Sequence, residues 1–97
     1  MNKSGSSPTS PIALTGDYDI ERRGELAQLF RAAEPFIELF IDLQDVGYAD
    51  STLLSELALL RKHNPTSRIV LIGPPPQLLT ILKLMAFDAV FEIDEHV

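Results

Sequence analysis

The residues best suited to chemistry are an acid and two hydroxyls in the stretch YADSTLL, residues 48–54. Asp50, Ser51 and Thr52 stand between an apolar run and a segment with helical periodicity, which places them at the start of a helix. Asp and Ser are common there for a local reason, because their oxygens accept hydrogen bonds from unpaired N–H groups of the first helical turn. Ser51 is therefore either part of a helix cap or a working hydroxyl of the protein.

Nucleophilic catalysis by Ser51 would need a general base within hydrogen-bond reach. The two histidines are poorly placed for this role. His63 lies about three turns further along the same predicted helix, where it suits the negative end of the helix dipole, and His96 is in the C-terminal tail. We therefore predict no catalytic residues and a protein that is not an enzyme.

Four aspartates follow two predicted strands and could gather at the edge where parallel strands end. They are Asp17, Asp19, Asp45 and Asp50. Together they would form an acidic rim around Ser51, and several carboxylates at one edge can hold magnesium. A metal-dependent enzyme is therefore an alternative to a binding protein, although we expect neither a metal nor a cofactor.

The length, composition and charge of the chain limit the classes of protein to which it can belong. It has 97 residues, 45% of them hydrophobic, no cysteine and a formal net charge of −6. This length supports one domain, the negative charge disfavours nucleic acid, and no apolar run approaches the roughly 20 residues that span a bilayer. We predict a disordered leader over residues 1–10, a single domain over residues 11–97, a cytoplasmic location and no membrane insertion.

Hydrophobic periodicity predicts alternating strands and helices. Strands are expected at residues 12–14, 36–43, 68–73 and 89–93, with Thr15-Gly16-Asp17 as the turn that ends the first. Helices are expected from Asp19 to Pro35, over residues 51–63, and after Pro74-Pro75-Pro76. This order predicts an α/β fold with a small, mostly parallel sheet and right-handed crossover helices. The nearly continuous apolar segment 36–43 predicts a strand that is covered on both faces of the sheet.

Two helices carry apolar residues beyond a single stripe. In helix 51–63 the predicted inner side is Leu53, Leu54, Leu57, Ala58 and Leu60. The predicted outer side is Thr52, Ser55, Glu56, Leu59 and Lys62. Leu59 is the apolar exception on that outer side. The third helix has leucines and Ile81 on more than one face, which leaves open whether it is wholly buried or supports a homodimer.

Four segments resemble, in order, the signature segments of the STAS domain family, named for sulfate transporters and anti-sigma factor antagonists. They are IALTGDYDI, FIDLQDVGYADSTLLSELALL, RIVLIGPPPQLLTIL and LKLMAFDAVFEI. The resemblance covers residues 11–95. Its most specific part is a strand followed by Asp-Ser-Thr at a helix start, and GDYD is similar to the family's Gly-Glu-Leu-Asp turn.

The resemblance implies a non-enzymatic bacterial regulator of transcription. In anti-sigma factor antagonists, the residue after the Asp is phosphorylated by an anti-sigma factor that is also a serine kinase, and phosphorylation breaks the complex. Carried over by position, the phosphorylated residue is Ser51. The implied partner-binding residues are Asp17, Asp19, Asp50, Thr52, Ser55, Glu56 and Leu59.

A second reading of the resemblance is a constitutive subunit, because some small STAS proteins bind the ATPase of an ABC lipid transporter. The sequence also departs from the family pattern. Leu53 replaces the glycine after the hydroxyl pair, Ala86-Phe87 stands where a Gly-Leu pair is common, and residues 1–10 predict no first strand.

Overall fold

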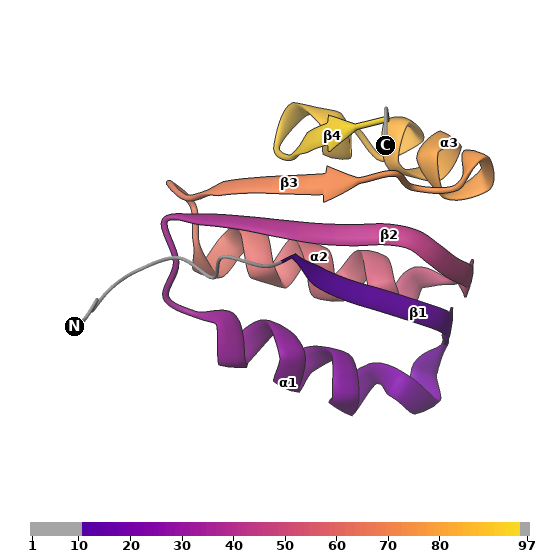
Figure 1. Ribbon diagram of the computed structural model, residues 1–97, viewed down its shortest axis with the longest axis horizontal. Coiled ribbons are helices and arrows are strands. Elements are labelled where there is room, and N and C mark those ends of the chain that lie inside the picture. The colour runs from indigo at the N-terminus through magenta and orange to yellow at the C-terminus, as the bar shows by residue number, and fades with distance from the viewer. Residues whose placement is uncertain (1–10, 96–97) are drawn as a thin grey trace.

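The computed structural model describes residues 11–95, so the predicted leader and His96 lie outside the described part of the chain. Strands, helices and short 3₁₀ turns follow one another along the sequence (Figure 1). The order is β1 (Ile12–Tyr18), η1 (Ile20–Arg22), α1 (Arg23–Ala33), β2 (Glu38–Ala49), α2 (Ser51–His63), β3 (Arg68–Ile72), α3 (Pro76–Leu84), η2 (Phe87–Ala89) and β4 (Glu92–Asp94). This confirms the predicted alternation. Within residues 11–95, no helix is both long and apolar enough to span a bilayer.

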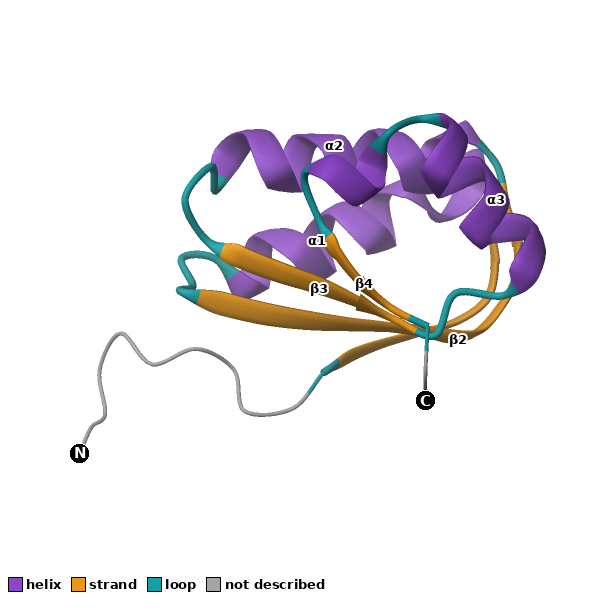
Figure 2. Cartoon of the chain, turned by 90° about the horizontal axis from the view of Figure 1, so that it is seen from above, coloured by secondary structure: helices purple, strands orange, loops and turns teal. Residues whose placement is uncertain are grey.

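The sheet has four strands in the order β1-β2-β3-β4, and every neighbouring pair is parallel. Each strand is laid down beside the previous one in the same direction. A right-handed crossover then brings every helix to the same face, and Figure 2 shows the three α-helices on one side of the strands. The prediction that β2 is covered on both faces was therefore wrong, because no helix among the described residues packs on the other side.

The core fills the space between the sheet and this helical layer. Alternate residues of β2, Leu39, Ile41 and Leu43, are completely buried there. They belong to one cluster with residues of the three helices, of which Phe30 and Leu57 are also completely buried. The core thus has a single layer and depends on every helix.

Local signals set the helix ends. The predicted range of α2, residues 51–63, is confirmed. Asp19 caps η1, its Oδ1 accepting a hydrogen bond from the Glu21 backbone N–H at 3.0 Å, and α1 ends at Ala33, two residues before Pro35. Pro76 occupies the first helical position of α3, where a missing N–H costs nothing.

The predicted strand bounds were less accurate. β1 runs on to Tyr18 and β2 runs on to Ala49, and these extensions pair with each other from Thr15↔Asp45 to Tyr18↔Ala49. Gly16 does adopt the positive φ expected of a turn, +83°, but the strand continues through it. The reason is that pairing between distant segments outweighed the local turn signal. β4 is shortened to Glu92–Asp94 because residues 87–89 form η2.

The extra length of β2 changes the shape of the sheet. Between Ile12↔Ile41 and Tyr18↔Ala49 the register shifts twice, so that β2 uses two more residues than β1. Such insertions bend a strand and increase its twist. In Figure 2 the carboxyl ends of the strands curve toward the helical layer.

Ala86, where the family commonly has glycine, adopts a left-handed conformation with φ 60° and ψ 27° directly after α3. This conformation costs a residue with a Cβ atom about 1–2 kcal/mol, a cost that glycine avoids. We expect Ala86→Gly to raise the free energy of unfolding by up to about 1 kcal/mol, after allowance for the more flexible unfolded chain. Urea denaturation measures this change. The control is Ala89→Gly in η2, where φ is not positive and the substitution should destabilise; a loss of stability in both variants would contradict the assignment.

Candidate functional site

Ser51 is the first residue of α2, and its side chain is exposed. The capping role belongs to its neighbour: Asp50 has an extended backbone, and its Oδ1 accepts a hydrogen bond from the Thr52 backbone N–H at 2.8 Å. Within residues 11–95 the Ser51 hydroxyl makes no hydrogen bond. The helix start is thus complete without it.

The end of β1 lies beside this helix start. The Asp50 backbone N–H donates to the Tyr18 carbonyl at 3.4 Å, which joins the last residue of β1 to the cap of α2. Tyr18 is 2% exposed, and its hydroxyl accepts hydrogen bonds from the Thr15 backbone N–H and from the Arg22 guanidinium. A buried side chain therefore anchors the strand end next to Ser51.

Arg22 holds the irregular part of β1 in place. Its Nη1 donates to the Thr15 carbonyl at 2.7 Å and to the Asp17 carbonyl at 3.2 Å, and its guanidinium lies 4.1 Å from the Tyr18 ring centroid. A Cβ on Gly16 would come 3.1 Å from the same Nη1, so glycine leaves room for this contact. Arg22 also makes two hydrogen bonds to Glu25.

The four aspartates do not converge on one point. Asp19 and Asp50 each cap the helix after their strand, while exposed Asp45 lies inside β2 opposite Thr15. Asp17 pairs in register with Tyr48 on β2, and a Cβ on Gly47 would come 2.7 Å from its Oδ1. No group of three His, Asp or Glu side chains suited to a metal ion occurs in the described range 11–95. The aspartates are spread along an acidic edge.

Two predicted outer-face residues of α2 are buried. Thr52 is 6% exposed and Glu56 is 3% exposed. Glu56 Oε2 pairs with Nε of Arg23, at the start of α1, at 3.2 Å. The outer-face prediction was wrong for both residues because α1 packs along this side of α2, and the periodicity of one helix does not reveal its neighbour.

The rest of α2 follows the prediction more closely. Ser55 and Lys62 are exposed, and Leu59 is half-buried. Ala58, predicted to face inward, is exposed. Leu53, which replaces the glycine of the family pattern, is completely buried and packs in the hydrophobic core. The accessible strip beside Ser51 therefore comprises Ser55, Ala58 and part of Leu59.

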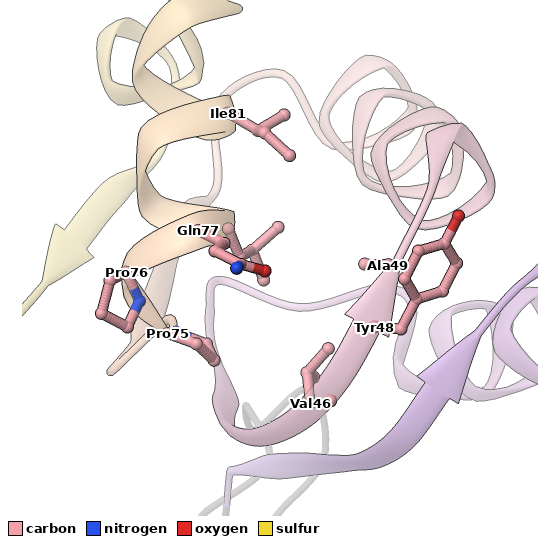
Figure 3. Close-up of a pocket in the computed structure, with 9 residues that line it drawn as sticks. Val46, Tyr48, Ala49, Pro75, Pro76, Gln77 and Ile81 are labelled. Atoms are coloured by element: carbon pink, nitrogen blue, oxygen red, sulfur yellow. The ribbon is translucent and has the colours of Figure 1, made fainter.

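A pocket of about 440 Å³, which we did not predict, opens next to the helix start (Figure 3). One wall is the end of β2, residues 46–49, and the other is the first turns of α3 from Pro75 to Ile81. Side chains of Val46, Pro75 and Ile81 make it mainly apolar, whereas Gln77 contributes an amide. Ala49, in the first wall, directly precedes Asp50 and Ser51. The only sequence signal was the apolar surplus of the third helix.

The Arg22–Glu25 pair gives the strand end a pH dependence. The hydrogen bond from Arg22 lowers the pKa of Glu25, so ionised Glu25 stabilises the folded state above its unfolded pKa of about 4.3. This contribution disappears as the pH falls through the lower folded pKa. We expect Glu25→Gln to destabilise the protein at pH 7, and we expect the difference from wild type to shrink as the pH falls below about 4.3 and Glu25 becomes protonated in the folded state.

Urea denaturation at several pH values measures this difference. The control repeats Glu25→Gln in an Arg22→Ala background, where the pH-dependent part should be absent. A difference of equal size at all pH values in the wild-type background would refute the role given to the pair.

Comparison with known proteins agrees with the fold. A family model described as "Mlab, STAS domain" matches residues 1–93. A comparison with curated protein sequences finds no match. The matched range takes in all four strands except Asp94, the last residue of β4, together with the Asp50-Ser51 helix start. The chain belongs to the STAS domain family, as the resemblance implied.

Proposed function

We propose that this STAS domain is a regulatory binding protein that docks an anti-sigma factor with kinase activity and is released when Ser51 is phosphorylated. The observation that carries the proposal is the division of roles at the start of α2. Asp50 caps the helix, and the neighbouring Ser51 hydroxyl is exposed and engaged with no described residue. A kinase can reach such a hydroxyl without unfolding the helix. The family match supports a binding role in general.

Phosphate chemistry is compatible with the fold at this position. A phosphate on Ser51 would lie at the N-terminus of α2, where backbone N–H groups and the helix dipole favour negative charge. It would add about −1.5 to −2 charges beside the carboxylate of Asp50 and near the acidic edge. The domain should therefore stay folded. A partner whose interface fits the neutral hydroxyl would be repelled by the phosphate.

The proposed interface centres on Ser51 and the strip of α2 that remains accessible. Ser55 and Leu59 extend it along the helix, and Asp17, Asp19 and Asp50 border it on the strand side. Thr52 and Glu56 lie beneath this surface, so they are proposed to support the interface from below. The apolar pocket next to Ala49 provides space for a partner side chain.

That pocket also favours a second candidate, a constitutive subunit bound to the ATPase of an ABC transporter. An apolar recess beside a hydroxyl forms a contact surface whose use requires no phosphate. In this case Ser51 contributes one hydrogen bond. Ser51→Ala should then weaken binding by about 1 kcal/mol, roughly fivefold, and Ser51 should carry no phosphate.

Wild type, Ser51→Ala and Ser51→Asp baits distinguish the two candidates in a pull-down from the native organism's lysate. Under the switch, wild type and Ser51→Ala capture an anti-sigma factor of the kinase class, and Ser51→Asp captures at least tenfold less, because the added charge faces the partner. Mass spectrometry identifies the captured proteins and tests for phosphate on Ser51. Thr66→Asp, an exposed substitution in the loop after α2, controls for added charge.

Ser51→Asp that binds the kinase as tightly as wild type would disprove the switch. Equal capture of a transporter ATPase by wild type and Ser51→Asp, without phosphate on Ser51, would support the second candidate.

A further inference from the structure

The face of the sheet turned away from the helices is unusual for a parallel sheet. Parallel sheets are found almost only with both faces covered, because their crossover helices normally occupy both sides. Here the three α-helices lie on one side (Figure 2). No other element among residues 11–95 packs on the opposite face, which we call the open face.

The strand register defines the residues of the open face. Leu39, Ile41, Ile69 and Leu71 are in the core, so the residues between them point the other way. The open face is formed by Ala13 of β1, Glu38, Phe40 and Asp42 of β2, Arg68, Val70 and Ile72 of β3, and Glu92 and Asp94 of β4.

Apolar residues occupy the middle of this face. Phe40 and Val70 are register partners, and Ile72 follows Val70 on the same side of β3. Val70 is only 4% exposed, although it is not part of the core cluster on the helical side. Phe40 and Ile72 are half-buried. They provide apolar surface that a partner can cover.

Charged residues surround this apolar centre. Arg68 pairs with Glu38 on β2 and with Glu92 on β4, where its Nη2 lies 2.9 Å from Glu92 Oε1, and its guanidinium lies 5.8 Å from the Phe40 ring centroid. Asp42 and Asp94 lie toward the other end of the strands. Four carboxylates and one guanidinium give the open face a net charge of −3.

The negative charge of the open face indicates which kind of molecule can bind there. A second copy packed face to face would bring two surfaces of −3 together at roughly 10 Å, which is repulsive. Anionic lipid and nucleic acid are disfavoured for the same reason. A helix is the element that normally covers a parallel sheet.

We propose that the open face binds an amphipathic helix of a partner protein, with apolar side chains over Phe40 and Ile72 and lysine or arginine on its flanks. The basic flanks lie beside Asp42 and the carboxylates around Arg68. This surface lies on the side of the sheet opposite α2. It therefore adds an interaction site that does not depend on the proposed Ser51 switch.

The test uses the full chain, ¹⁵N-labelled, and a synthetic helical peptide with leucine and alanine on one face and lysine on both flanks. A peptide with glutamate in place of lysine is the comparison. We expect the lysine peptide alone to shift the amide resonances of Phe40, Val70 and Ile72, with weaker binding at high salt.

Three variants test the location. Ile72→Lys should weaken binding of the lysine peptide by about tenfold or more, and Asp42→Asn, which keeps side-chain shape, by severalfold. Leu84→Lys makes the same apolar-to-cationic change at a residue of α3 that is 80% exposed, and should leave binding unchanged. Ser51→Asp should also leave it unchanged, which separates this proposal from the switch.

Several results would overturn the proposal. One is a set of shifts confined to the start of α2, and another is equal binding of the glutamate peptide. If deleting residues 1–10 shifts the amide resonances of Phe40, Val70 and Ile72 in the absence of peptide, the open face binds that segment instead. A concentration-dependent dimer that Ile72→Lys dissociates would assign it to a second copy.

Discussion

The handedness of the strand connections is the constraint on which this structure depends. Four parallel strands are added in sequence order, and connections between parallel strands of one sheet are right-handed almost without exception. All helices must then share one face, where they enclose one core. The same constraint brings the starts of η1 and α2 to the edge where β1 and β2 end, so that Asp19 and Asp50, which cap them, lie at the same edge of the sheet. The edge that carries Ser51 and the uncovered face of the sheet both result from one topological rule.

At that edge, Asp50 and Ser51 have different roles, which explains how the fold can tolerate the modification proposed at Ser51. Asp19 and Asp50 supply the oxygens that the first turns of two helices require. Ser51 can therefore change chemically without removing a cap. Tyr18 and Arg22 keep the neighbouring strand end fixed from the buried side. The exposed Ser51 hydroxyl is therefore not needed for the contacts that hold this edge of the fold together.

The sequence predicted features that arise locally and missed those that arise from distant contacts. The bounds of α2 were correct because Asp50 and the leucine spacing are encoded within that segment. The strand extensions were missed because the polar half of β1 is held by its pairing with β2 and by Arg22, and neither contact is local in the sequence of the strand. Thr52 and Glu56 were misplaced because α1 covers them, and the pocket was missed because residues 50–74 separate its two walls in the sequence.

The two surplus residues of β2 have a consequence for the outer edge of the sheet. β1 pairs with β2 on one side only, and in the described chain its other side has no strand partner. A long, straight edge of this kind exposes a row of amide and carbonyl groups that can recruit strands from other molecules. The register shifts curve and twist this edge, and Gly16 interrupts its regular geometry. The bend that shapes the sheet around its core thereby also protects the chain against ordered aggregation.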